Sequence, residues 1–171
     1  MYVKRERYLK KIRPVYESDL IKVITGVRRC GKSILLEQIR DEFINANYKD
    51  NHIITVNFED LKYEKIRSYL KLNDYILDKI EDEDKYVIFL DEIQHVKSFE
   101  KVLASLRTSV NCTIFVTGSD SKLLSGSLAT LLVGRCIEFK ILPFSYSEAF
   151  EFVSNNDKSI SHSDFILDYI N

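Results

Sequence analysis

The segment of residues 26–33 constrains the fold of this chain more than any other feature of its sequence. It reads Gly-Val-Arg-Arg-Cys-Gly-Lys-Ser and fits the pattern G-x-x-x-x-G-K-[ST] without a mismatch. An apolar run at residues 20–25 precedes it, and apolar residues at helical spacing follow it. The two glycines allow the backbone to curl until its N–H groups point at one anion, and the start of the following helix adds unpaired donors. The segment therefore predicts a phosphate-binding loop between a strand and a helix.

Lys32 and Ser33 extend this prediction from a phosphate to a nucleoside triphosphate with its metal ion. A lysine at this position reaches the β- and γ-phosphates, and the hydroxyl that follows it can ligate Mg²⁺. The alternative is a glycine turn that begins a helix and binds nothing. The strand before the loop and the helix after it favour binding, and the residues expected to contact the nucleotide are Gly26, Val27, Arg28, Arg29, Cys30, Gly31, Lys32, Ser33 and Ile34.

Short apolar runs alternate with longer segments of helical period along the rest of the chain. Apolar stripes at helical spacing occupy residues 35–46 and 99–110, the second behind a candidate N-cap at Ser98. This alternation predicts an α/β fold in which helices cover both faces of a mostly parallel sheet. The last run alternates apolar and charged residues, which is typical of a half-solvated edge strand. The five predicted strands are residues 20–25, 53–58, 86–90, 113–117 and 136–142.

Two adjacent carboxylates, Asp91 and Glu92, follow the apolar run at residues 86–90. Ligands of open α/β sheets bind at the carboxyl ends of the strands, so this pair is expected beside the loop. Asp91 fits the role of holding Mg²⁺, and Glu92 fits that of orienting the attacking water. Taken alone, the pair would be a solvated strand end. The loop upstream favours the functional interpretation.

The segment between the loop and the carboxylates holds a full helix, the strand at residues 53–58 and further helical sequence at residues 63–70 and 73–80. The strand that ends at Asp91 is therefore not the next strand after the loop. This spacing is typical of P-loop ATPases with an extra strand between the two motif strands. It predicts a three-layer P-loop NTPase with a mostly parallel five-stranded sheet of order 5-1-4-3-2. No N-K-x-D guanine-reading motif occurs, so ATP is favoured over GTP.

Two further residues are candidates for a role in hydrolysis. Ser119 ends a Thr-Gly-Ser segment after the fourth strand, where a hydroxyl can sense the γ-phosphate; the alternative is a turn in which Ser119 caps the next helix. Arg135 precedes the last strand, near where such ATPases place an arginine finger; the alternative is a surface arginine at a helix end. The predicted catalytic residues are Glu92, Lys32, Ser119 and Arg135, and the predicted metal ligands are Ser33 and Asp91.

Charge and composition exclude several kinds of protein. The 25 basic and 26 acidic side chains nearly cancel, so no overall field attracts nucleic acid or an anionic membrane. A basic helix predicted at residues 4–12 keeps a local basic patch open. The longest apolar run, residues 86–90, is far shorter than the roughly 20 residues of a membrane span, and the charged N-terminus lacks the apolar core of a signal peptide. Three widely spaced cysteines support neither a disulfide framework nor a zinc site. We expect a cytoplasmic protein without a membrane span.

The motifs together resemble a large prokaryotic family of AAA-like ATPases. That family shares G-x-R-R-x-G-K-S, an apolar strand ending in D-E-I-Q, T-G-S, and a late G-R…E…L-P-F-S-x-x-E. The resemblance covers residues from about 5 to about 152 and implies binding of ATP and Mg²⁺, with Glu92 as the hydrolytic residue. The matching segments are residues 26–33, 91–94, 117–119, 134–135, Glu138, residues 142–145 and Glu148.

Members of this family typically continue beyond such a core, into a helical lid or winged-helix region and a C-terminal domain that is sometimes nuclease-like. The resemblance therefore implies an ATPase core at residues 1–144 and the start of a lid or C-terminal extension at residues 145–171, with the remainder missing. Ser145 and Glu148 predict a capping box that opens a helix at this boundary. The apolar pattern of residues 165–170 predicts a helix that the chain end interrupts.

We expect Mg²⁺-dependent binding and hydrolysis of ATP by an AAA-like domain. Its expected partners are the nucleotide and the missing C-terminal domain, and a homo-oligomer is left open. One alternative is a nucleotide-occupied regulatory switch with little intrinsic hydrolysis. A second is the ATPase module of a DNA-handling protein, which only the basic helix supports.

Overall fold

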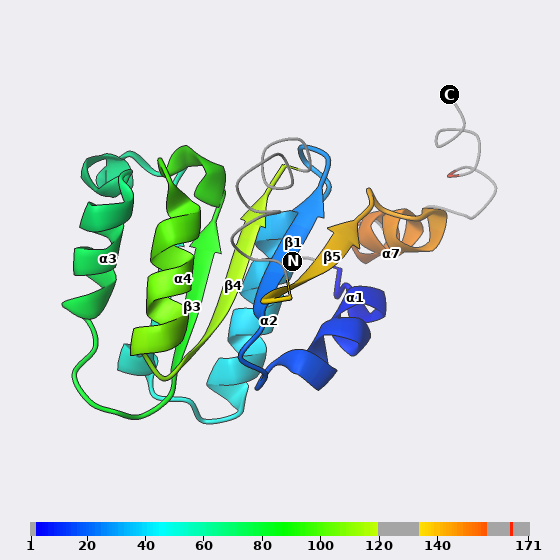
Figure 1. Ribbon diagram of the computed structural model, residues 1–171. Coiled ribbons are helices and arrows are strands. Elements are labelled where there is room, and N and C mark those ends of the chain that lie inside the picture. Colours follow the sequence, from blue (N-terminus) through cyan, green and yellow to red (C-terminus); the bar gives the residue numbers. More distant parts are fainter. Residues whose placement is uncertain (1–2, 120–133, 157–164, 166–171) are drawn as a thin grey trace.

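A parallel five-stranded sheet forms the middle layer of the structure (Figure 1). The computed structural model describes residues 3–119, 134–156 and 165. The strand order is β2-β3-β4-β1-β5, so the predicted order 5-1-4-3-2 is confirmed. The strands are β1 (Ile21–Gly26), β2 (Ile53–Asn57), β3 (Tyr86–Asp91), β4 (Cys112–Gly118) and β5 (Cys136–Ile141).

The strand order decides which loops share an edge of the sheet. β4 separates β1 from β3, and β5 pairs with β1 on the other side. Gly26 pairs with Ile141 and Asn57 pairs with Asp91, so the ends of four strands meet at one edge. Because all strands are parallel, the loop after β1 and the carboxylates after β3 open on the same side of the molecule.

Helices cover both faces of the sheet (Figure 1). The helices α3 (Tyr69–Leu77) and α4 (Phe99–Ser109) pack on one face, and α1 (Glu6–Ile12) and α2 (Lys32–Asn45) pack on the other. The side chains of β3 alternate between these two cores, and all six of its residues are buried. Such burial stabilises the fold by about 1.5–3 kcal/mol for each large apolar side chain. A strand buried on both faces must be continuously apolar, and this requirement explains the sequence of β3.

The edge strands differ from the central ones as the sequence predicts. In β5, exposed and half-buried residues alternate up to the buried Ile141, and in β2 only Ile54 and Val56 are buried. Short 3₁₀ turns connect several elements: η1 (Arg13–Val15), η2 (Asp50–His52), η3 (Leu61–Ile66) and η4 (Ile93–His95).

The region before α3 departs from the predicted pattern. Residues 61–66 form the 3₁₀ turn η3 and the helix begins at Tyr69, whereas helical period alone predicts a helix at residues 63–70. The reason is a tertiary contact: Ser68 bridges Lys97, and the Tyr69 N–H donates to the Lys97 carbonyl. Ser98 occupies the predicted N-cap position of α4, but its backbone is left-handed and its side chain makes no capping hydrogen bond.

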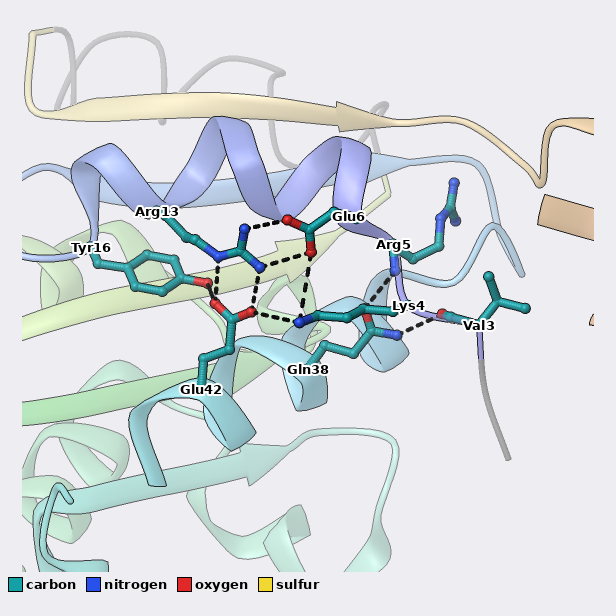
Figure 2. Close-up of polar contacts among 8 residues, drawn as sticks. All are labelled: Val3, Lys4, Arg5, Glu6, Arg13, Tyr16, Gln38 and Glu42. Carbon is teal, nitrogen blue, oxygen red and sulfur yellow. Dashed lines mark hydrogen bonds and ion pairs between the residues drawn. The ribbon is translucent and has the colours of Figure 1, made fainter. Parts of the chain in front are cut away.

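The N-terminal segment is built into the fold through ion pairs (Figure 2). Arg13 binds Glu6 at 2.5 Å and Glu42 of α2 at 2.6 Å, and the Tyr16 hydroxyl donates to the same Glu42 carboxylate at 3.0 Å. Lys4 lies 3.5 Å from Glu42. The hydrogen bonds from Arg13 hold the pKa of the Glu42 carboxyl below its usual range. The predicted basic helix therefore exists, and the basic residues that flank it face carboxylates of their own chain.

The helix α7 (Tyr146–Asn156) follows β5 and begins with the predicted capping box. The Ser145 N–H donates to the Glu148 carboxylate at 2.9 Å, and the Glu148 N–H donates to the Ser145 hydroxyl at 3.4 Å. Residues 157–164 and 166–171, on which the predicted interrupted helix falls, lie outside the described residues, apart from Phe165. Among the described residues, no helix has the length and apolar character that crossing a membrane requires.

Candidate nucleotide-binding site

The loop after β1 has the tight backbone that its glycines permit. An added Cβ at Gly26 would lie 2.4 Å from the Ile141 carbonyl oxygen and 2.7 Å from the Cys30 Sγ, so only glycine fits there. Gly31 has a φ of +92° and Arg29 a φ of +65°, both in the left-handed region. Alternation of left- and right-handed residues turns successive N–H groups toward one point, which is how backbone binds an anion.

Lys32 opens α2 and its ammonium group is buried above the loop. The side chain is 5% exposed, and its Nζ lies 3.3 Å from the carbonyl oxygens of Gly26 and Val27 and 3.6 Å from the Glu92 carboxylate. A buried cation needs charged or hydrogen-bonding partners. These three acceptors lie at 3.3–3.6 Å from Nζ, so a phosphate that bound Lys32 at closer range would replace one of them.

Asp91 ends β3 in a largely buried position beside the loop. Its carboxylate accepts hydrogen bonds from the hydroxyl groups of Thr117 and Ser33. Burial raises the pKa of the Asp91 carboxyl, the two hydroxyl hydrogen bonds lower it, and the nearby Glu92 and Glu59 raise it again. A buried carboxylate beside a serine hydroxyl is a donor set suited to a hard divalent cation, whose charge would offset the burial.

Glu92 adopts an unusual backbone conformation that aims its side chain at Lys32. Its φ is +55°, which costs about 1–3 kcal/mol in a residue other than glycine and is kept only where the surroundings enforce it. The Glu92 N–H donates to the Thr117 hydroxyl at 2.9 Å, and the Gln94 amide donates to the Glu92 carboxylate. Thr117 and Gln94 therefore fix the position of Glu92.

Two cavities adjoin these residues. The first has a volume of about 350 Å³ and is lined by Arg28, Arg29, Gly31, Lys32, Ser33, Ile34, Glu59 and Glu92. The second has a volume of about 280 Å³, and besides Lys32 and Glu92 it is lined by Arg28, Glu59, Gln94, His95 and Ser119. Cavities of this size suit small-molecule ligands. Positive charge lines the loop side and carboxylates line the strand side, as a phosphate chain with a bound cation requires.

The structure brings most of the predicted site residues together. Lys32, Ser33, Glu92 and Ser119 line the two cavities at this edge of the sheet, and Asp91 lines a smaller pocket that shares Ser33 with the first cavity. Val27, Arg28, Arg29 and Ile34 are exposed on or beside the loop. Cys30 is buried instead, and burial raises the pKa of its thiol.

Arg135 lies away from this group. Its carbonyl oxygen accepts from the Ile21 N–H at 2.9 Å, at the start of β1, whereas the loop follows the other end of that strand. The two ends of β1 are separated by its six residues, at about 3.3 Å each. The structure therefore does not bring Arg135 to the loop of its own chain.

Three residues of this region escaped prediction from the sequence: Thr117, Gln94 and Arg5. Thr117 lies two residues before the predicted Ser119, and its inward direction follows from strand alternation, a signal that was present. Gln94 belongs to the Asp-Glu-Ile-Gln segment, but its bond to Glu92 depends on the left-handed turn at that residue. Arg5 contacts the loop from 25 residues away, and no local signal indicates this.

The sheet order, the glycine loop after β1 and the carboxylate pair after β3 together define an AAA+-like P-loop ATPase core. Residues 18–150 match a protein-family model described as an AAA domain. The chain therefore belongs to the AAA domain family.

Relatives and solved structures agree with this assignment. The chain is 42% identical over 147 residues to an uncharacterized protein of Haemophilus influenzae, covering 85% of this chain and 37% of that protein. It is 41% identical over 138 residues to an uncharacterized protein of Methanocaldococcus jannaschii, covering 81% and 30%. The chain thus spans about a third of the length of these curated relatives.

Two solved structures share the fold at low sequence identity. Cdc6p from Pyrobaculum aerophilum has a TM-score of 0.64 at 10% identity, with 92% of this chain and 52% of that chain covered. The Aeropyrum pernix ORC1 protein, solved in complex with DNA, has a TM-score of 0.62 at 11% identity, with 93% and 50% covered. At these identities the similarity shows the fold alone.

Proposed function

We propose that this domain binds ATP with Mg²⁺ at residues 26–34 and hydrolyses the bond between the β- and γ-phosphates. The observation that carries the proposal is the meeting of Lys32, Asp91 and Glu92 at one edge of the sheet, beside the glycine loop and its cavities. Backbone N–H groups of the loop and the Lys32 ammonium bind the phosphates, and Ser33 with Asp91 holds the cation. Bound Mg²⁺ supplies neutralisation of the phosphate charge.

In this proposal Glu92 orients water for attack on the γ-phosphorus. Its carboxylate is fixed by Gln94 and by its own backbone bond to Thr117, so it is already placed before the substrate arrives. Ser119 lines the same cavity and contacts the γ-phosphate or the water. We also propose a cytoplasmic location. In an oligomer, Arg135 of a second copy would add a further cation at the γ-phosphate.

Single-turnover ATP hydrolysis in Lys32→Ala and Glu92→Gln variants tests the proposal. We expect Lys32→Ala to weaken nucleotide binding, and Glu92→Gln to retain binding while hydrolysis falls by about 100-fold or more. Two exposed residues, Lys71 and Glu83, provide matched controls as Lys71→Ala and Glu83→Gln. Turnover that persists unchanged in the Lys32→Ala, Glu92→Gln double variant would refute hydrolysis at this site.

A second candidate function is a nucleotide-occupied switch that hydrolyses little by itself. The contact between Lys32 and Glu92 favours it, because a carboxylate paired with the phosphate-binding lysine is not free to orient water. The two functions predict different effects of a C-terminal extension on the rate of hydrolysis. If the switch is correct, single-turnover hydrolysis is slow for this chain and rises in a longer protein that extends it at the C-terminus. If hydrolysis is intrinsic, both proteins react at similar rates.

The DNA-handling alternative finds less support in the structure than in the sequence. Of the six basic residues between positions 4 and 13, Lys4, Arg5 and Arg13 form ion pairs with carboxylates of this chain. The exposed Arg7, Lys10 and Lys11 are the basic residues of this segment that remain for nucleic-acid phosphates.

A further inference from the structure

Arg5 is a fully enclosed arginine that joins three segments far apart in the sequence. Its side chain is 1% exposed. Nη1 donates to the Cys30 carbonyl oxygen in the loop at 2.8 Å, and Nη2 donates to the Leu142 carbonyl oxygen after β5 at 2.9 Å. Nε donates to the Glu148 carboxylate in α7 at 2.8 Å. Because the guanidinium is planar and rigid, its three hydrogen bonds fix the positions of the three acceptors relative to one another.

The backbone of Arg5 is also held in place, by the helix that follows the loop (Figure 2). The Gln38 side chain in α2 accepts from the Arg5 N–H at 2.9 Å and donates to the Val3 carbonyl oxygen at 2.8 Å. The guanidinium lies over the rings of Tyr8 and Phe144, at 4.7 and 5.0 Å from their centroids. Arg5 is therefore anchored to the core and cannot move independently of it.

At the loop, Arg5 fixes the direction of one peptide group. None of the peptide bonds described is cis, so the Gly31 N–H points opposite to the Cys30 carbonyl. That carbonyl is directed at Arg5, which places the Gly31 N–H on the side away from Arg5. Gly31 lines the larger cavity, beside Lys32 and Ser33. Arg5 therefore supports the loop from behind in the form that presents a donor to an anion.

At its other end, Arg5 holds the start of α7. The Glu148 carboxylate uses one oxygen for Arg5 and the other for the Ser145 N–H, so the capping box and the ion pair share one side chain. The Leu142 N–H donates to the Tyr8 hydroxyl at 3.1 Å, which adds a second link from α1 to the same turn. The first turn of α7 is thus fixed relative to the loop through a single guanidinium.

We propose that Arg5 is a positioning residue that couples the nucleotide loop to α7, so that occupancy of the loop and docking of α7 stabilise each other. This proposal rests on nucleotide binding at residues 26–34. A coupling free energy acts in both directions, so a nucleotide that orders the loop also protects the start of α7. Coupling between two sites typically changes affinity by about 5–150-fold.

Affinity for Mg·ADP and amide hydrogen exchange, measured on the same variants, test the proposal. Arg5→Gln removes the guanidinium group, and Arg5→Lys keeps the positive charge on a single ammonium group. Glu148→Gln keeps a hydrogen-bond acceptor for the capping box and removes the negative charge that pairs with Arg5. Arg13→Gln is the matched control, because Arg13 is an arginine of the same segment whose side chain, among the described residues, pairs with Glu6 and Glu42 and not with the loop or α7.

We expect Arg5→Gln to weaken Mg·ADP binding by about 10-fold and Arg5→Lys to restore only part of it. Mg·ADP should slow amide exchange in both the loop and residues 146–156 of the unmodified chain and of Arg13→Gln. In Arg5→Gln and Glu148→Gln, saturating Mg·ADP should still slow amide exchange in the loop, but it should not slow exchange in residues 146–156. If Arg5 only stabilised the fold, its substitution would lower the free energy of unfolding, and Mg·ADP would still slow amide exchange in the loop and in α7 together.

The outcomes separate this proposal from the proposed function. If Mg·ADP slows amide exchange in α7 of Glu148→Gln as much as in the unmodified chain, the coupling is overturned. This variant provides the test even if Arg5→Gln does not fold. Binding of Mg·ADP without any change in α7 overturns the coupling alone. Failure of the unmodified chain to bind Mg·ADP overturns nucleotide binding, and the coupling with it.

Discussion

Gly26 lies where β1, the loop and the end of β5 converge, and its lack of a side chain is a packing requirement. The Ile141 carbonyl oxygen and the Cys30 sulfur occupy the space in which a Cβ would lie. Gly134 also has a positive φ, +70°, but nothing lies within 4 Å of its Cβ position. Gly26, whose φ is +154°, therefore combines steric exclusion with backbone strain, whereas Gly134 has the strain alone.

Gly26→Ala is expected to destabilise the fold by more than about 3 kcal/mol, because both neighbouring atoms would have to move. Gly134→Ala should cost only the left-handed strain of about 1–2 kcal/mol. Urea unfolding of the two variants and the unmodified chain measures the difference. Equal losses would show that close packing at Gly26 does not matter.

Lys22 is a fully buried lysine in β1, and among the described residues no carboxylate forms an ion pair with its ammonium. Its Nζ donates to the Thr113 hydroxyl at 2.7 Å and to the Tyr16 carbonyl oxygen at 3.3 Å. The pKa of Lys22 is lowered to about 8, first by burial and then by the charge of Lys85, while Glu17 acts to raise it. In the unfolded chain the lysine would titrate near 10.5.

Between about pH 8 and pH 10.5 the unfolded chain therefore binds more protons at Lys22 than the folded chain. Stability attributable to this residue should rise with pH across that window, by at most about 1.4 kcal/mol per pH unit, and be flat below pH 8. The free energy of unfolding of the unmodified chain minus that of Lys22→Met, measured from pH 7 to 9.5, isolates the effect. A difference that stays constant or falls with pH would contradict it.

At the scale of elements, the site depends on the contact between β3 and β4. Leu90 pairs with Val116, which places Asp91 and Thr117 side by side at the ends of these strands. The Thr117 hydroxyl donates to the Asp91 carboxylate and accepts from the Glu92 N–H, so one side chain of β4 positions both acidic residues.

Thr117→Val keeps the shape of this side chain and removes its hydrogen bonds. Because the Glu92 N–H loses its partner, we expect a stability loss of about 1–3 kcal/mol. We also expect ATP turnover to fall by about 10-fold or more with a smaller change in KM. Thr117→Ser, which keeps the hydroxyl, is the control and should retain most of the activity. Steady-state kinetics of both variants provide the check, and equal turnover in Val and Ser would exclude the positioning role.

At the scale of the whole molecule, ligand binding should raise the stability of the folded state. Nucleotide at 100 times its Kd contributes about 2.7 kcal/mol. For a domain of this length, that corresponds to a rise in Tm of about 5–10 °C. Thermal unfolding with and without Mg·ADP should show the rise in the unmodified chain and in Lys71→Ala, but not in Lys32→Ala. A similar rise in Lys32→Ala would place the nucleotide elsewhere.

The sequence alone determined the strand order and indicated the core of the candidate site. Apolar periodicity is local, so it marked the five strands, and the strand between the loop and Asp91 matched the arrangement of P-loop ATPases with an extra strand, which predicted the order of the sheet. The loop pattern and the acidic pair identified Lys32, Ser33 and Glu92 because each follows directly on a strand or opens a helix.

Only the tertiary structure decided which distant side chains support these residues. Arg5 and Glu148 are 143 positions apart, and their contact depends on the packing of α1 against β5 and α7. The position of Arg135 was likewise settled by the register of β5 on β1, which sets it at the start of these strands. Such contacts follow from three-dimensional packing of whole elements, and residue spacing along the chain contains no record of them.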